Sequence, residues 1–148
     1  MKINLTKNQY LALMKLVYLG NWLANASRLQ DEQIKEYEEM EGYIFSFAEE
    51  FGCNRYVEHE PEDDARYFPT RYFEEEAEVR GLIEDYDNEI FWQEAVDRFG
   101  DRDFIKKYGR EEIEKMDRDE RFIKIMECQE KYEKEFEENG IERMEIKE

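Results

Sequence analysis

Apolar residues fall on nearly every side of a helix predicted near the start of the chain, in the stretch TKNQYLALMKLVYLGNWLANA from Thr6 to Ala26. Only a narrow polar strip interrupts them, near Lys15 and Asn21. A helix that is apolar all round belongs in the middle of a bundle or beneath a partner. This stretch is too short and too interrupted to span a membrane. Thr6 followed by Gln9 predicts a capping box at its start.

The same helix and the spacing of apolar residues after it predict the packing of the chain. Trp22 lies on the most apolar face of the first helix, so we expect it in the core, where truncation to alanine would cost about 3–5 kcal/mol. Later segments repeat apolar residues at helical intervals. They predict helices over Asp31–Phe51, from Arg71 to an interruption at 85–88, from there to a stop at Gly100, in two short pieces around Gly109, and from a cap at Asp117 to about Asn139.

Two segments do not follow the helical pattern. Met1, Ile3 and Leu5 alternate with polar residues, and so do Met144 and Ile146, which predicts a two-stranded β-ribbon formed by the termini. The segment Cys53–Thr70 contains both prolines, the single histidine and a dense group of acidic residues, so we expect a long surface loop there.

These patterns together predict the fold class. We expect an all-α protein, a single compact helical bundle of five to seven helices with the terminal ribbon added. A chain of 148 residues without an internal repeat or a linker is expected to form one domain over residues 1–148. The composition, 41% hydrophobic and 15% aromatic, argues against disorder despite the charge.

Charge narrows the classes of partner. The chain has 40 acidic and 22 Lys and Arg residues, a formal net charge of −18. Such a surface repels nucleic acid and anionic membranes and attracts basic proteins, so we expect a basic protein partner, no direct nucleic-acid binding and no membrane binding. The sequence leaves the oligomeric state open. Cys53 and Cys128 follow no motif spacing, and the start of the chain lacks a secretion signal, so we expect free buried thiols in the cytoplasm.

Two clusters of side chains could carry chemistry. Glu58, His59 and Glu60, with further carboxylates close behind, form a ligand set suited to a transition metal. The plainer interpretation is a solvated acidic loop, because the chain has one histidine and a helical di-metal site uses several inward-facing Glu and His pairs. The run 74–78 holds four glutamates that could act in acid–base chemistry, but such a run is usually the wet face of a helix.

Motifs for other chemistry are missing from the sequence. There is no G-x-S-x-G, no phosphate-binding glycine loop and no C-x-x-C. We therefore expect no catalytic residue, no cofactor and no bound metal.

Two segments carry a resemblance to known proteins: KLVYLGNWLANA at 15–26 and YDNEIFWQEAVDRFGDRDFIKKYG at 86–109. With the ending YEKEFEENGIERMEI, they resemble a group of small acidic bacterial proteins that carry no assigned function. The resemblance implies a helical domain of bacterial type and transfers no site residue.

The leading functional hypothesis is a cytoplasmic protein that acts by protein–protein interaction as a regulator or adaptor. The expected contact surface is an acidic belt, which we define as Glu58, Glu60, Glu62, Asp63, Asp64, Glu74, Glu75 and Glu78. One alternative is a nucleic-acid mimic whose carboxylates replace phosphates and inhibit a DNA- or RNA-binding protein. The other is a metal-dependent enzyme that uses the loop around His59.

Overall fold

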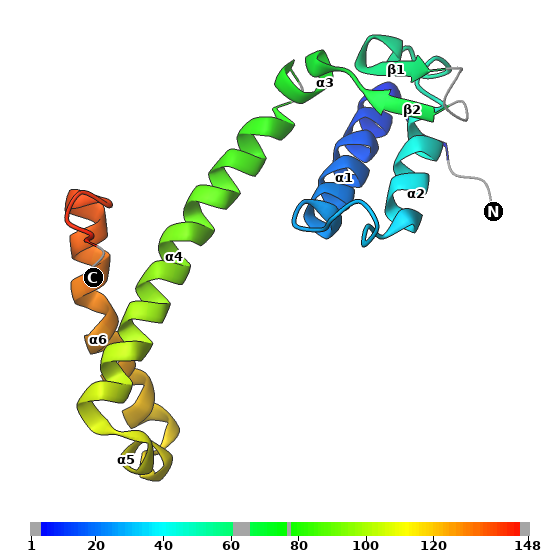
Figure 1. Cartoon of the computed structure of the whole chain (residues 1–148). Helices are drawn as coiled ribbons and strands as arrows, with labels where there is room; N and C mark the ends of the chain where they lie inside the picture. The colour runs from blue at the N-terminus through cyan, green and yellow to red at the C-terminus, as the bar shows by residue number, and fades with distance from the viewer. Residues whose placement is uncertain (1–3, 61–65, 77, 146–148) are drawn as a thin grey trace. The chain divides into compact units, whose positions relative to one another are not determined.

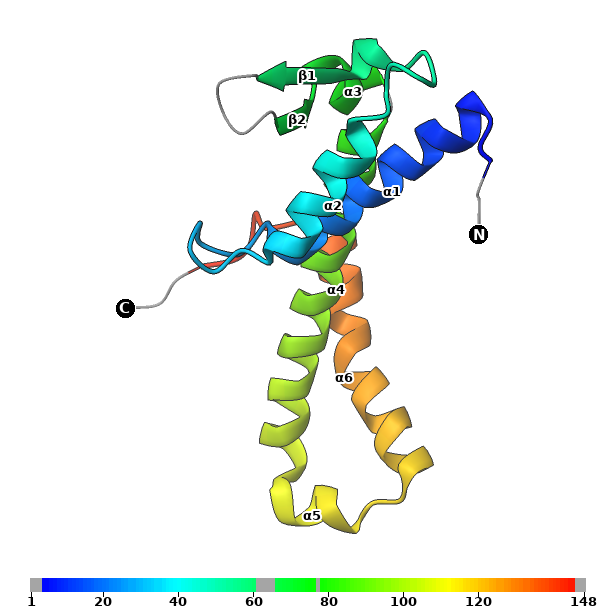
Figure 2. The same cartoon turned by 90° about the vertical axis from the view of Figure 1, so that its right-hand side faces the viewer.

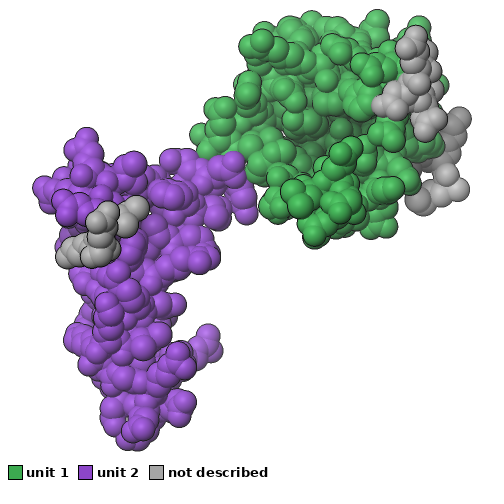
Figure 3. All heavy atoms as spheres, viewed as in Figure 1, with its two compact units in different colours: residues 1–85 green, residues 86–148 purple. Residues whose placement is uncertain are grey.

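The chain divides into two compact units. The structure, a computed structural model, describes residues 4–60, 66–76 and 78–145. Residues 1–85 form unit 1 and residues 86–148 form unit 2 (Figure 3). The sequence predicts one domain, and it contains no linker at this boundary. The sequence does not reveal this boundary, because the boundary lies inside a continuous helix.

Unit 1 combines two packed helices with a small β-hairpin (Figure 1). In chain order its elements are α1 (Lys7–Asn25), α2 (Lys35–Phe45), the 3₁₀ turn η1 (Asn54–Tyr56), β1 (Val57–Glu60), β2 (Arg66–Pro69), α3 (Arg71–Glu76) and the first turns of α4 (Val79–Tyr108). α1 packs along α2, and β2 contacts α2 (Figure 2). The predominantly helical fold with a small two-stranded ribbon confirms the predicted fold class.

The start of α1 confirms its predicted capping box. The Thr6 hydroxyl accepts a hydrogen bond from the Gln9 backbone N–H at 3.3 Å, and Gln9 Oε1 accepts one from the Thr6 N–H at 2.9 Å. These bonds satisfy backbone N–H groups that the first helical turn leaves without partners. The helix start is therefore specified by four residues of local sequence.

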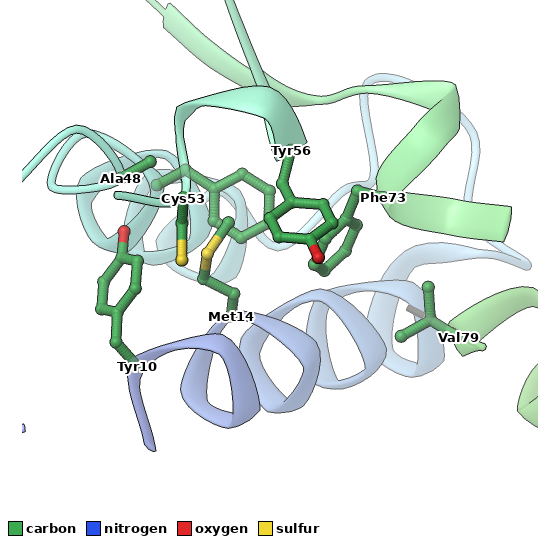
Figure 4. Packing of buried hydrophobic residues seen from close by; sticks show 8 residues of the cluster. Tyr10, Met14, Ala48, Cys53, Tyr56, Phe73 and Val79 are labelled. Atoms are coloured by element: carbon green, nitrogen blue, oxygen red, sulfur yellow. The ribbon is translucent and has the colours of Figure 1, made fainter. Parts of the chain in front are cut away.

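Aromatic rings fill the core of unit 1. Its buried residues come from α1, the end of α2, the turn that follows it, η1, α3 and the start of α4 (Figure 4): Tyr10, Met14, Phe45, Ala48, Cys53, Tyr56, Phe73 and Val79. The Tyr10 ring stacks on Phe51 at 4.2 Å between centroids, and its hydroxyl donates to the Ile44 carbonyl at 2.6 Å. The hydroxyl therefore has a partner, as a tyrosine in a core requires.

α1 is less buried than its sequence predicts. Only Tyr10 and Met14 are buried on it, whereas the side chains of Leu16 and Leu23 are 67% and 64% exposed. Trp22 is only partly buried, so its predicted place in the core is wrong. α2 packs along α1, and α3 contacts it through Phe73 and Glu74, which both lie against Tyr18.

The β-ribbon lies in a segment predicted to be a loop. β1 and β2 pair antiparallel, with Val57 opposite Pro69 and Glu60 opposite Arg66. Acidic residues and prolines concealed these two short strands, whose β-branched and aromatic residues suit a pleated sheet. The predicted terminal ribbon falls largely on residues 1–3 and 146–148, which lie outside the described residues. Leu5 and Met144, its described members, belong to no strand.

Unit 2 is a helical hairpin. The remainder of α4 and α6 (Arg118–Asn139) run side by side in Figures 1 and 2, and the short α5 (Arg110–Lys115) joins them. Asp117 caps α6 as predicted, since its Oδ1 accepts from the Glu120 N–H at 2.8 Å. The helix also stops at Gly140 as predicted, where φ is +55°.

Contacts between the two long helices hold this hairpin. Phe99 stacks on Tyr132 at 5.2 Å, while Phe104 and Cys128 are buried together near α5. Asp103 on α4 accepts hydrogen bonds from Lys131 and from the Tyr132 hydroxyl on α6, and it also pairs with Arg102. These three donors favour the carboxylate and hold the pKa of Asp103 well below its usual range.

α4 runs through two predicted breaks. It passes the expected interruption at 85–88 and the expected stop at Gly100. Gly100 is buried, and a Cβ there would overlap the Gln129 side chain and lie 3.3 Å from its Cα. The glycine therefore allows α4 and α6 to approach closely. The break between α3 and α4 lies instead near Glu78, where φ is +59°.

The other predicted elements fit with shifted ends. α2 is shorter than the predicted Asp31–Phe51 helix, because turns replace its last residues before Gly52. Both cysteines are free and buried, as expected. In the ranges that the structure describes, none of the helices combines the length and apolarity that crossing a membrane requires.

Candidate functional site

A cleft of about 680 Å³ opens in unit 1 between α2 and β2. α2 supplies one wall, β2 supplies the other, and Asn21 reaches in from α1. The hairpin packs on α2 through β2. A buried ionisable group lines this cleft.

That group is the carboxyl of Glu41. The residue is only 9% exposed, although it lines the cleft. Asn21 Nδ2 donates to Glu41 Oε2 at 3.0 Å. Among the described residues, no hydrogen bond reaches the second oxygen, Oε1. Oε1 is also not among the buried side-chain atoms that lack a partner, so it is open to solvent and is a free acceptor at the cleft.

A chain of amide side chains fixes Asn21 in this role. Asn25 Nδ2 donates to Asn21 Oδ1 at 2.8 Å, which leaves the Asn21 amide group pointing its own donor at Glu41. Asn25 in turn accepts from the Ile34 backbone N–H at 2.8 Å, just before α2 begins. The network joins the end of α1 to the start of α2. Oε2 of Glu41 is therefore committed to the fold.

Burial changes the acidity of Glu41. Loss of solvation disfavours the carboxylate and raises the pKa of Glu41 to about 7; repulsion from Glu38 acts in the same direction, and the Asn21 hydrogen bond opposes it. At neutral pH, about half of the molecules therefore hold this carboxyl in its neutral form. A cation placed beside Oε1 would restore the favourable solvation that burial removed.

The walls of the cleft combine carboxylates with aromatic rings. Glu38 and Glu39 line it from α2, and Arg66 Nη1 on β2 pairs with Glu38 Oε1 at 3.2 Å. Aromatic side chains complete the lining: Tyr43 from α2, and Tyr67 and Phe68 from β2. Aromatic faces attract cations through the quadrupole of the ring. Carboxylates with aromatic rings form a set suited to an organic cation.

A second polar pair lies near Glu41 on the core side. The Tyr18 hydroxyl donates to Glu74 Oε1 at 2.8 Å. Burial and the Glu74 carboxylate raise the pKa of Tyr18, and Glu41 adds to this effect. Tyr18 therefore stays neutral at physiological pH and places no negative charge near Glu41.

The described members of the predicted acidic belt have three different settings. Glu58 and Glu60 are exposed on β1. Glu74 is partly buried and bonded by Tyr18, whereas Glu75 pairs with Arg71 at 2.8 Å. The remaining members are Glu78, which is exposed at the break before α4, and Glu62, Asp63 and Asp64, which lie outside the described residues.

The predicted metal set around His59 also has a structural setting. His59 lies on β1, and its ring stacks on Tyr67 at 4.5 Å. Within residues 4–60, 66–76 and 78–145, no three His, Cys, Asp or Glu side chains gather into a group able to hold a metal ion.

Sequence reasoning missed Glu41, although a signal was present. Glu41 follows Tyr37 by four residues and precedes Ile44 by three, so it sits on the apolar stripe of its helix. A carboxylate at such a position is unusual enough to mark a buried polar site. Asn21 gave the matching signal, since it interrupts the apolar surface of the first helix.

Comparison of the chain with protein-family models, curated proteins and solved structures finds no match. The resemblance to small acidic bacterial proteins stays a prediction, and the function is argued from the site alone.

Proposed function

We propose that this is a cytoplasmic, non-enzymatic binding protein whose partner is a basic protein, and that the partner docks at the cleft between α2 and β2. One observation carries the proposal. Glu41 presents a free carboxyl oxygen at the cleft from a position that is 91% buried, among acidic and aromatic side chains. Burial disfavours the charged form of this carboxyl, and a positive group on a partner would offset that cost.

Charge supports a basic partner. The net charge of −18 attracts basic proteins over distance and speeds their arrival. The cleft then provides what a charged surface alone lacks, namely a specific acceptor beside aromatic surface. Tyrosine is enriched among the residues that dominate binding energy at interfaces, and Tyr43 and Tyr67 both line the cleft.

The side chains of the cleft also support a binding role over a catalytic one. Acid–base catalysis needs a proton donor or acceptor placed beside a second reacting group. Here Oε2 of Glu41 is held by Asn21 and Glu38 is paired with Arg66, so the neighbouring polar groups serve the fold.

The test is affinity capture from a bacterial lysate with quantitative mass spectrometry. Wild type, Glu41→Gln and Glu36→Gln are immobilised in parallel. Glu36 is exposed on the same helix and does not line the cleft, so Glu36→Gln makes the same chemical change away from the cleft and serves as the matched control. We expect wild type and Glu36→Gln to retain the same basic protein. Glu41→Gln should retain at least about tenfold less of it, because loss of a buried charge pair costs about 2 kcal/mol or more.

Salt provides the second arm of the test. Retention should weaken between about 50 and 500 mM salt because screening reduces the attraction between the two proteins. If all three proteins capture the same set, or if the captured proteins are not basic, the proposed function is wrong.

A further inference from the structure

We infer that the α2–β2 cleft binds a primary alkylammonium group, with the ammonium on Glu41 Oε1 and the aliphatic chain against the tyrosine rings. This inference deepens the proposed function, on which it rests for the class of partner. On a basic protein, the group is the side chain of lysine.

The single free oxygen selects ammonium over guanidinium. A guanidinium group binds a carboxylate best through two parallel hydrogen bonds, one to each oxygen. Asn21 occupies Oε2 of Glu41, which leaves Oε1 alone. An ammonium group is a compact point charge that can use one oxygen and turn its other N–H groups to neighbouring acceptors. The chain also places its own guanidinium, from Arg66, at Glu38.

The hydrogen bond selects against a quaternary ammonium. A quaternary group has no N–H donor and depends on aromatic faces that surround it. The aromatic side chains Tyr43, Tyr67 and Phe68 line this cleft together with carboxylates, and a quaternary group could not donate a hydrogen bond to Oε1. A divalent metal ion is disfavoured as well, because within the described parts of the chain no three acidic, Cys or His side chains gather to hold one.

Charged groups from each adjoining element define how pH acts on the site. Glu38, Glu39 and Lys35 line the cleft from α2, and Arg66 lines it from β2. On the core side, Tyr18 of α1 is neutral and bonded to Glu74 of α3. Glu41 is the group among them whose pKa is raised to about 7.

Binding therefore releases a proton from each molecule whose Glu41 is neutral. The ammonium enters charged, and a neutral Glu41 gives its proton to the buffer as the ion pair forms. The ionised fraction of a group with a pKa of about 7 rises from roughly a tenth at pH 6 to nine tenths at pH 8. We expect the affinity for the ammonium to rise about tenfold over the same interval.

The experiment titrates the full chain with n-butylammonium, and separately with butylguanidinium, tetramethylammonium and calcium chloride at equal ionic strength. Backbone amide shifts in two-dimensional NMR report the site. We expect saturating shifts at Gly42 and Tyr67, which line the cleft, with a Kd on the order of 1–10 mM for so small a probe. The three other cations should bind at least several-fold more weakly.

Variants separate the charge from the fold. Glu41→Gln keeps an acceptor for Asn21, so the protein should stay folded while its butylammonium affinity and the pH dependence are lost. Glu36→Gln should bind as wild type does. Calorimetry in phosphate and in Tris at pH 7 should show release of about half a proton for each ammonium bound.

Two longer probes identify the source of the amine. A Gly-Lys-Gly peptide that binds more tightly than a free aliphatic triamine assigns the site to a protein partner, as the proposed function requires. The reverse order keeps the ammonium site and overturns the proposed partner. The ammonium site itself is refuted if butylammonium fails to shift Gly42 and Tyr67 at 50 mM, or if Glu41→Gln binds it with wild-type affinity and pH dependence.

Discussion

Replacing Glu41 by glutamine should make the protein more stable at high pH, and this gain should fall to less than half near pH 5 and vanish below about pH 4. The cause is the unusual acidity of this carboxyl, whose pKa is raised from 4.5 to about 7 by burial. Between these two values, the folded chain holds a proton that the unfolded chain has lost. The free energy of unfolding of the wild type therefore falls as pH rises through this window. Glutamine cannot ionise, so the variant escapes the loss.

The size of the effect follows from the interval between the two pKa values. Each unit of pKa difference corresponds to about 1.4 kcal/mol, so the interval from 4.5 to about 7 gives a ceiling of about 3 kcal/mol. Water that enters the cleft solvates the carboxylate and reduces the effect. We expect Glu41→Gln to exceed wild type by about 2 kcal/mol at pH 8.

The measurement must report unit 1 alone. The two tryptophans divide between the units, with Trp22 in unit 1 and Trp92 in unit 2. In a Trp92→Phe background, the fluorescence of Trp22 follows unit 1 during urea unfolding at pH 5, 6, 7 and 8. The free energy of unfolding is compared for the Trp92→Phe protein and for the same protein with Glu41→Gln or with the exposed control Glu36→Gln. The control should match the Trp92→Phe protein at every pH.

Two results would refute this reasoning. The first is a difference between Glu41 and Glu41→Gln that stays constant from pH 5 to pH 8, which would mean that Glu41 ionises normally in the folded state. The second is a variant that is less stable at pH 8, which would mean that the carboxylate is needed by the fold and that the hydrogen bond from Asn21 favours it more than burial disfavours it.

Three further predictions concern packing and charge. Met14→Ala should lower the free energy of unfolding of unit 1 by about 2–5 kcal/mol because Met14 is fully buried. Leu16→Ala, at an exposed position on the same helix, should lower it by less than about 0.5 kcal/mol. Equal losses for the two variants in urea titrations would contradict the exposure of Leu16. Gly100→Ala should destabilise unit 2 by about 1–3 kcal/mol because the new methyl group overlaps Gln129, whereas Gly20→Ala, which meets open space, should stabilise unit 1 by about 0.5–1 kcal/mol. Unfolding of unit 2 is monitored by Trp92 fluorescence. An increase in stability for Gly100→Ala would show that α4 and α6 are further apart. Asp103→Asn should lower the stability of unit 2 at pH 7 and make that stability fall less as the pH drops below about 4. The reason is that a carboxyl with a lowered pKa in the fold stabilises it at pH values above the pKa of the unfolded chain, and this contribution disappears when Asp103 is protonated. An unchanged acid transition would contradict the prediction.

The features that sequence predicted correctly are local ones. The capping bonds at Thr6 and Asp117 each involve residues three positions apart, so a short stretch contains all the groups that form them. The stop at Gly140 is likewise set by the residue itself. The existence of the long helices follows from apolar spacing over several turns, which is why most were predicted despite shifted ends.

The features that sequence missed depend on contacts between distant segments. Gly100 is a helix stop by local rules, but its close approach to Gln129 decides its role. Trp22 belongs in a core by its apolar neighbours, yet it is only partly buried, because its burial depends on which distant segments pack on α1. The candidate site was missed for the same reason, since Glu41 gains its raised pKa from burial, which exists only when distant segments pack together.

The two buried cysteines give the intact chain one internal probe of unfolding in each unit. Cys53 is fully enclosed in the core of unit 1, and Cys128 is nearly enclosed in that of unit 2. A thiol reagent reaches either sulfur only while the surrounding core is open, so each labelling rate reports the opening of its own unit. Mass spectrometry of one sample can read both rates. Coincident rates across a urea series would identify one cooperative folding transition, and separate rates would identify two, without cutting the chain or adding a dye.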